Sequence, residues 1–199
     1  MLADVGPVWG IAQSLITALA GLGGVGVGAW MTGRNQKKER KNARIKEQLQ
    51  DFYSPLLALR AEIKAKSEFR LKVRNAAGSA WTGKFGGERT PERLQDISER
   101  DGPDYDRIID YDNKQLEKEL IPQYRKMIDC FSTHLWLANP STLSHYGALV
   151  EYVEVWNRCL ANAIPGEVVR AIGIEEKMLY PLYEDLQHNF DALNDELRK

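Results

Sequence analysis

The sequence predicts an all-α protein with one N-terminal transmembrane helix followed by an antiparallel four-helix-bundle-like cytoplasmic domain. Three observations predict this fold. Val5–Gly33 contains no ionisable side chain, the later apolar residues recur at steps of three and four, and no segment shows the alternation of a β-strand. We expect four parts: a short periplasmic N-terminus 1–7, the span 8–32, a basic juxtamembrane segment 33–46 and a helical domain 47–199.

Composition excludes several classes of protein before any motif is considered. The chain has 199 residues with a net charge of −1 and 43% hydrophobic residues, so a folded core is possible and wholesale disorder is not expected. Its two cysteines exclude a disulfide-stapled secreted scaffold. Charge is sorted along the chain: residues 34–74 hold 13 Lys and Arg against 5 Asp and Glu, and residues 75–199 hold 14 against 22. We expect no nucleic-acid partner, because the domain that follows the basic segment is acidic.

The uncharged segment 8–32 is long enough for a membrane-spanning helix. Trp9 and Trp30 bracket it, and their separation corresponds to about 32 Å of helix, close to the thickness of the hydrocarbon core. We therefore predict that both indoles are interfacial anchors. A cleaved signal peptide is the alternative, because Ala18-Leu19-Ala20 has a small-x-small pattern. The stretch before it lacks the Lys or Arg of a signal peptide, and the apolar run continues beyond it.

The charges that flank the span predict its orientation. Only Asp4 precedes it, whereas seven basic residues follow it within 14 positions. The positive-inside rule then places the N-terminus outside and the helical domain in the cytoplasm, where Cys130 and Cys159 stay reduced. The basic residues determine topology or contact lipid headgroups. They are Arg34, Lys37, Lys38, Arg40, Lys41, Arg44 and Lys46.

Small residues form a ridge along one face of the predicted span. Ala20, Gly24, Gly28 and Thr32 follow one another at steps of four. Such a ridge allows a second helix to approach closely, so we predict that the span self-associates through Ala20, Gly24 and Gly28.

The helical domain is predicted element by element from its apolar stripes. In the first helix, apolar residues recur at steps of four and three from Ile45 to Ile63, as in a coiled coil. Pro55 lies inside this helix, so we expect a kink near Asp51 or a restart of the helix there. A glycine-rich loop at 76–91, a short helix at 91–100 and a break at Asp101-Gly102-Pro103 follow. Three further helices are expected over 104–138, from Ser141 to Ile164, and from 175 to the end. Their stripes run Ile109–Leu135, Leu143–Ile164 with Val150 and Val153, and Leu179–Leu197.

Two histidines could begin a metal site. His134 and His145 lie symmetrically about the predicted turn at Asn139-Pro140, so an antiparallel hairpin would bring them face to face. A third ligand is not evident, so we expect neither a metal nor a cofactor, and a hydrogen-bonded pair is the ordinary interpretation. A cluster of four acids between Asp104 and Asp112 is interpreted as a solvated helix start.

Three stretches resemble a group of bacterial proteins: FYSPLLALRAEIKAKSEFR, IIDYDNKQLEKELIPQYRKM and WLANPSTLSHYGALVEYVEVWNRCL. This resemblance to uncharacterised single-span membrane proteins with a cytoplasmic helical domain covers most of residues 50–195. It implies the bacterial inner membrane as the location and no particular activity.

We therefore expect a membrane-anchored helical scaffold or interaction protein, not an enzyme, with the lipid bilayer, a second copy of itself and a cytoplasmic protein as partners. One alternative is a membrane effector of defence or stress whose assembly perturbs the bilayer. A remote alternative is a metal-dependent enzyme at the corner formed by His134 and His145.

Overall fold

The computed structural model describes residues 36–86 and 90–199. The chain divides into two units, Met1–Lys46 and Glu47–Lys199. In the first unit the described residues, 36–46, are helical. The predicted span 8–32 lies outside the described residues. Within the ranges that are described, no helix combines the length and the apolar character needed to cross a membrane.

The second unit consists of helices joined by short connections, and the described part contains no strand. This confirms the predicted all-α class. The elements in chain order are η1 (Gln48–Tyr53), α2 (Ser54–Lys84), α3 (Pro91–Gln115), η2 (Leu116–Leu120), α4 (Ile121–Thr133), η3 (Leu135–Leu137), α5 (Pro140–Leu143), α6 (Tyr146–Leu160), α7 (Gly166–Ile172), η4 (Glu176–Leu179) and α8 (Tyr180–Leu197).

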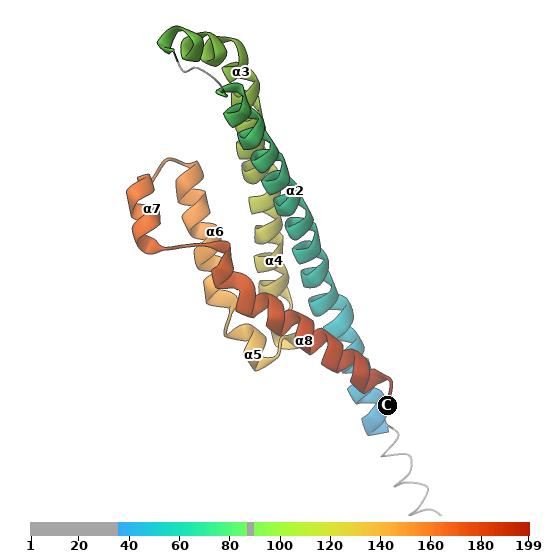
Figure 1. Cartoon of the computed structure of the whole chain (residues 1–199). Helices are drawn as coiled ribbons and strands as arrows, with labels where there is room; N and C mark the ends of the chain where they lie inside the picture. Colours follow the sequence, from blue (N-terminus) through green and yellow to red (C-terminus); the bar gives the residue numbers. More distant parts are fainter. Residues whose placement is uncertain (1–35, 87–89) are drawn as a thin grey trace, which may run out of the picture. The chain divides into compact units, whose positions relative to one another are not determined.

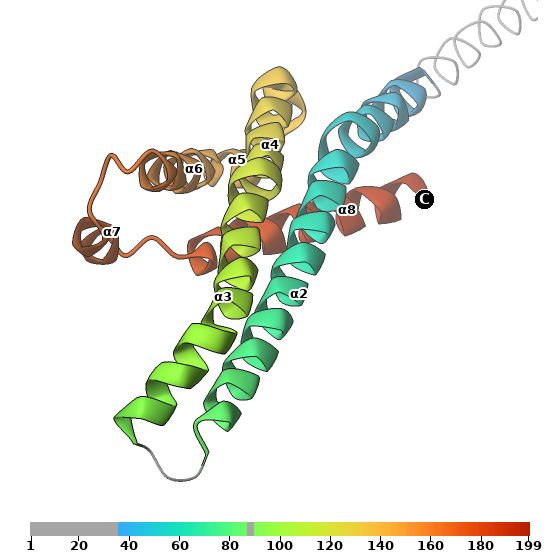
Figure 2. The same cartoon turned by 90° about the horizontal axis from the view of Figure 1, so that it is seen from above.

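The core lies where four of these helices meet. Helix α4 packs against α2 on one side and α6 on the other, and α8 crosses α2 and η1 (Figures 1 and 2). The Phe52 ring meets the Phe131 ring edge-on at 5.0 Å between centroids, and both side chains are fully buried. The other large, fully buried side chains come from η1, α2, α4, η3, α6, η4 and α8. They are Tyr53, Leu56, Ile63, Ile121, Met127, Leu137, Leu149, Leu179, Leu182 and Leu186.

Prolines mark where the helical elements begin. Five of them stand in the first turn of an element, where the missing N–H has no intrahelical acceptor to lose. These are Pro55 in α2, Pro91 in α3, Pro122 in α4, Pro140 in α5 and Pro181 in α8.

A wide π-helical turn precedes two of these prolines, η1 before Pro55 and η2 before Pro122. A proline ring clashes with the carbonyl four residues earlier, which is Asp51 in η1 and Lys118 in η2. The wider turn relieves this clash without ending the helix. The predicted irregularity near Asp51 is confirmed. Pro55 has no N–H to donate to the carbonyl of Asp51, and the Cys130 thiol lies 3.7 Å from that oxygen.

Two predicted breaks are absent. Helix α2 continues through the expected loop to Lys84, and α3 runs without interruption across Asp101-Gly102-Pro103. The glycines of this region are tolerated because it is exposed; a Cβ at Gly78 would meet no atom within 4 Å. Pro103 stays inside α3, where a bend accommodates it (Figure 1). The acidic cluster therefore lies within α3 and not at a helix start.

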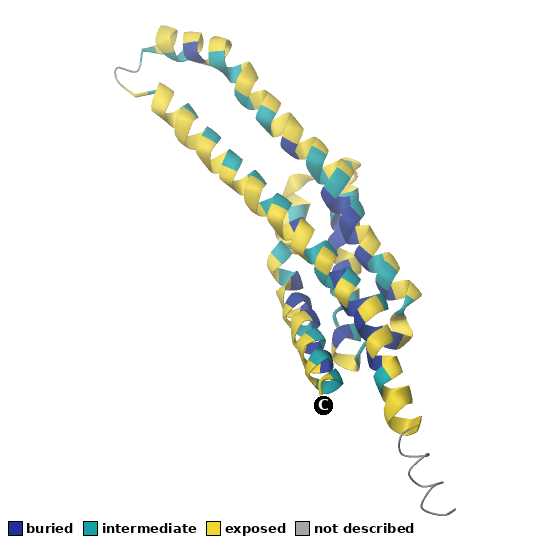
Figure 3. Ribbon diagram, turned by 90° about the vertical axis from the view of Figure 1, so that its right-hand side faces the viewer, coloured by how far each residue is buried: buried dark blue, intermediate teal, exposed yellow. Residues whose placement is uncertain are grey.

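The second unit has two regions that differ in burial (Figure 3). The arm comprises residues 64–84 of α2 together with α3, and the body comprises residues 47–63 and 116–199. Figures 1 and 2 show the two arm helices extending together beyond the other helices. Only two side chains in the described part of the arm are buried, Ile97 and Asp112, whereas the body contains nearly all of the core.

The predicted apolar stripes fit the body better than the arm. Leu179, Leu182, Leu186 and Leu193 of the last stripe are buried, as predicted. In the preceding helix the stripe is partly wrong, because Val150 is exposed while Leu149, Tyr152 and Val155 face the core. The helix expected over 104–138 ends at Thr133, and both ends of its stripe, Ile109 and Leu135, are exposed.

Candidate functional site

A depression lined by polar and aromatic side chains lies where α2, α4, α6 and η4 converge. This tyrosine pocket has a volume of about 550 Å³. Tyr124 of α4 and Tyr152 of α6 form its floor, with ring centroids 5.0 Å apart. Basic side chains of α2 and acidic side chains of η4 and the segment before it form its rim. These rim residues are Arg60, Lys64, Arg70, Arg74, Glu175 and Glu176.

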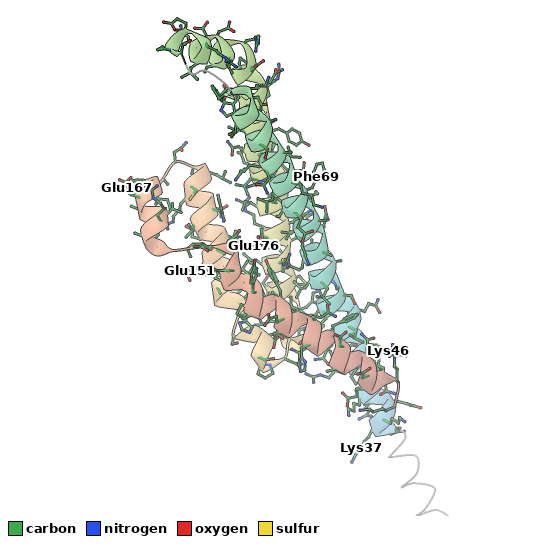
Figure 4. The ribbon with its side chains drawn as sticks, in the orientation of Figure 1. Lys37, Lys46, Phe69, Glu151, Glu167 and Glu176 are labelled. Carbon is green, nitrogen blue, oxygen red and sulfur yellow. The ribbon has the colours of Figure 1, made fainter. Side chains whose placement is uncertain are left out.

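Two interactions connect the floor of the pocket to Glu176. The Tyr124 hydroxyl donates to Oε1 of Glu176 at 3.3 Å, and Nη1 of Arg60 lies 4.0 Å from the same oxygen. The guanidinium of Arg60 also stacks on the Tyr183 ring, 3.8 Å from its centroid. Figure 4 labels Glu176 in η4, just before the start of α8. These contacts fix η4 against α2 and α4.

Burial determines the protonation states of the tyrosines in and beside this pocket. It raises the pKa of Tyr124, Tyr152 and Tyr183 above the ordinary value for tyrosine, because the phenolate would lose its hydration. The three hydroxyls therefore stay protonated at neutral pH, and that of Tyr124 donates to Glu176. A general base would need a pKa near neutrality, so these tyrosines are suited to binding and not to proton abstraction.

Charges on the rim are largely neutralised by one another. Lys64 lies 3.9 Å from Glu68, and Arg70 and Arg74 lie 3.9 and 3.7 Å from the buried carboxylate of Asp112. One atom stands apart: Nη1 of Arg60 is buried and has no hydrogen-bond acceptor within the described part of the chain. The pocket thus offers aromatic surface and paired charges, which suits a protein segment better than a small charged substrate.

A buried polar network joins η1, α5 and α8 at the turn between α4 and α6. The Tyr53 hydroxyl accepts from the backbone N–H of Asn139 at 3.1 Å and lies 3.2 Å from Oγ1 of Thr142. Thr142 in turn donates to Asp185, and the Asn189 amide donates to Asp185 Oδ2 at 3.0 Å. Each buried group has a partner, so this network positions the turn and is not a reactive site.

The structure describes six of the seven basic residues predicted beside the membrane. All six side chains are exposed on the helix of residues 36–46; Lys37 and Lys46 are labelled in Figure 4. They are Lys37, Lys38, Arg40, Lys41, Arg44 and Lys46. The other predicted site residues, Arg34, the anchors Trp9 and Trp30, and the ridge Ala20, Gly24 and Gly28, lie outside the described residues.

The structure places the histidines and cysteines at helix ends and in half-buried positions. His134 ends α4 and His145 precedes α6. In the ranges 36–86 and 90–199, no group of three or more His, Cys, Asp and Glu side chains could hold a metal ion. Cys130 and Cys159 are both free and half-buried. Burial raises the pKa of the Cys130 thiol to about 11, so it is a protonated donor and not a nucleophile.

The tyrosine pocket is not evident from the pattern of residues in the sequence. Its residues come from α2, α4, α6 and η4, so they are far apart in the chain, and Tyr124 entered the analysis only as part of an apolar stripe. Tyr152 was missed because the predicted stripe of its helix followed Val150 and Val153. A weak signal was present in the spacing of Tyr152 and Trp156, which share a helix face at a step of four.

Comparison with known proteins adds no assignment. No family model matches the chain, and neither a curated protein nor a solved structure matches it.

Proposed function

We propose that the protein is a membrane-anchored helical interaction protein, held in the bacterial inner membrane by residues 8–32 and presenting its helical domain to the cytoplasm. The observation that carries this proposal is the order of three segments: a stretch without charge, a helix bearing six exposed basic side chains, and a helical domain. Exposed Lys and Arg next to an apolar segment are what anionic headgroups attract, by about 1 kcal/mol for each residue near the surface.

Two features of the helical domain favour binding over catalysis. Tyr124 of the pocket is protonated and donates to Glu176, and the acidic and basic side chains around it pair with one another. The arm exposes large apolar side chains on two helices, including Phe69 and Tyr111. Exposed apolar surface of this kind is typical of protein interaction sites.

Membrane fractionation tests the anchor. The full chain should remain in the pellet after alkaline extraction of bacterial membranes, because a spanning helix is not held by charge. A variant in which the seven basic residues are replaced by glutamine should also stay in the pellet, whereas Leu15→Lys with Leu19→Lys and Leu22→Lys should release the protein. Release of the wild-type chain by alkali would contradict a spanning anchor.

Topology is tested by a reporter after Lys199. The seven basic residues that follow the span and the absence of any before it predict a reporter that is active only in the cytoplasm. Periplasmic activity would overturn the orientation.

Self-association of the span is tested on residues 1–44 alone in a membrane two-hybrid assay. Gly24→Ile or Gly28→Ile should weaken association severalfold, because bulk on the small-residue ridge separates the helices. Val25→Ile, about 100° around the helix from Gly24, is the matched control. Equal association by all variants would make the anchor a monomeric tether.

The same ridge supports one alternative, a membrane effector whose assembly perturbs the bilayer. Growth arrest on overexpression that requires Gly24 and Gly28 would favour the effector. Association without any loss of membrane potential would favour the scaffold.

A further inference from the structure

The arm exposes aromatic side chains that nothing in the described part of the chain covers. Phe69 of α2 is 67% exposed and Tyr111 of α3 is 64% exposed. Figure 4 shows Phe69 projecting away from α2. Neither ring contacts another aromatic ring in the described residues. Burial of side chains of this size is favourable, so a partner that covers them gains binding free energy.

These two residues border a groove between α2 and α3 of about 390 Å³. Val73 and Ile108 line it as well, and Phe69, Val73, Ala76 and Ala80 follow one another on α2 at steps of 4, 3 and 4. This side of the arm, the Phe69 face, is therefore an apolar helix stripe on which no further helix of the described residues packs.

The opposite side of the arm is partly covered by its own residues. Leu71 and Ile109 lie two positions from Phe69 and Tyr111, about 200° around their helices. On that side Trp81 packs against Tyr105 at 4.7 Å and against Phe85 at 4.9 Å between ring centroids. The Phe69 face carries the more exposed pair of large apolar side chains, since Leu71 and Ile109 are each 56% exposed.

The charges of the two arm helices indicate which partner fits this face. Residues 64–84 of α2 carry six Lys and Arg against one Glu, whereas α3 carries eight Asp and Glu against four Lys and Arg. One arm helix is therefore strongly positive and the other strongly negative. A partner that matches both must present a negative helix to α2 and a positive helix to α3.

We propose that the partner is a second copy of this chain, whose arm packs against the Phe69 face about a two-fold axis along the arms. Viewed along this axis, the four helices occupy the corners of a square, and each α2 lies between the α3 of its own copy and the α3 of the other copy. Every positive helix then has two negative neighbours, and every neighbouring pair is antiparallel. The interface is isologous, so Phe69 of each copy lies beside Tyr111 of the other.

The size of the interface fits a dimer that forms on the membrane. The 21 residues of α2 in the arm span about 31 Å, and two helices side by side are about 20 Å wide. Each copy therefore buries about 600 Å², near the lower limit for a specific interface. Confinement of both copies to one membrane raises their effective concentration, and in this respect alone the inference depends on the proposed function.

Site-directed cross-linking of the full chain in membranes tests the arrangement. Two differently tagged chains, both with Cys130→Ala and Cys159→Ala, are co-expressed; one carries Phe69→Cys and the other Tyr111→Cys. Oxidation should join the two tags in a covalent dimer. The matched control places Leu71→Cys and Ile109→Cys in the two chains, at the same height on the other side of the arm, and should give no covalent dimer.

The charge argument has its own test on the same cross-link. Lys72 is exposed beside Val73, and Lys72→Glu in both chains should lower the yield severalfold because it places acids against the acidic helix of the partner. Lys72→Arg keeps the charge and should leave the yield unchanged. Failure of the Phe69 and Tyr111 positions to cross-link, or equal yields from both pairs of positions, would overturn the arm dimer. Loss of the chain from the membrane pellet would instead overturn the anchor.

Discussion

The body and the arm of the helical domain both contain α2, but they differ in what covers it. Up to Ile63, α2 is enclosed by α4 and α8 and contributes fully buried side chains. Beyond Ile63 it has α3 as its neighbour, and its exposed surface is charged with interspersed aromatic residues. The body is therefore stabilised by its own core, whereas the arm leaves apolar surface exposed.

The largest loss of stability is expected from a cavity in the body. Phe131 is fully buried, with Phe52 at 5.0 Å and Tyr146 at 5.4 Å between ring centroids. Phe131→Ala should lower the free energy of unfolding by about 3–5 kcal/mol, because packing contacts are lost and a cavity remains. Chemical denaturation of the full chain in detergent measures it. Ile109→Ala in the arm, where the side chain is exposed, should cost less than about 0.5 kcal/mol. Equal losses would remove the distinction between body and arm.

The next largest loss of stability is expected when the polar network of the body is disrupted. Thr142→Val should destabilise by about 1–3 kcal/mol, because the Tyr53 hydroxyl and the Asp185 carboxylate lose a buried partner. The double variant with Tyr53→Phe should be non-additive, since the two residues share one hydrogen bond. Strict additivity in a double-mutant cycle would mean that the network does not act as a unit.

A smaller effect is expected at Cys130. Cys130→Val should cost about 1 kcal/mol, because the carbonyl of Asp51, to which Pro55 has no N–H to donate, loses the thiol as its partner. Pro55→Ala restores the N–H and should reduce this cost. A cost that is independent of residue 55 would assign the role of Cys130 to packing.

The smallest effect concerns pH at the tip of the arm. The Arg100 guanidinium, and then the Lys84 ammonium at 2.8 Å, lower the pKa of Asp101 to about 2. A carboxylate whose folded-state pKa lies below its unfolded value of about 3.9 stabilises the structure above that value and loses this contribution as pH falls toward 2. Amide signals near Lys84 should therefore shift below pH 4, and Asp101→Asn should abolish the shift. A midpoint near 4 in the wild type would contradict the contact.

The residues explain why prediction from sequence was better for the body than for the arm. The stripe Leu179–Leu193 has one buried face, so its periodicity reports the structure directly. In the arm, Gly78 and Pro103 indicated breaks, but both lie in exposed helix, where a glycine or a bend costs little. The tyrosine pocket was beyond prediction because Tyr124, Tyr152 and Glu176 meet only through tertiary packing.

Hydrogen exchange of the full chain in membranes tests whether the arm depends on a partner while the body does not. Amides of α4 and α6 should exchange slowly in the wild type and in Phe69→Glu alike. Amides of α2 beyond Ile63 and of α3 should be protected in the wild type and exchange at least tenfold faster in Phe69→Glu, while Leu71→Glu leaves them protected. Arm amides that exchange at the same rate in all three proteins would contradict the dependence of the arm on a partner.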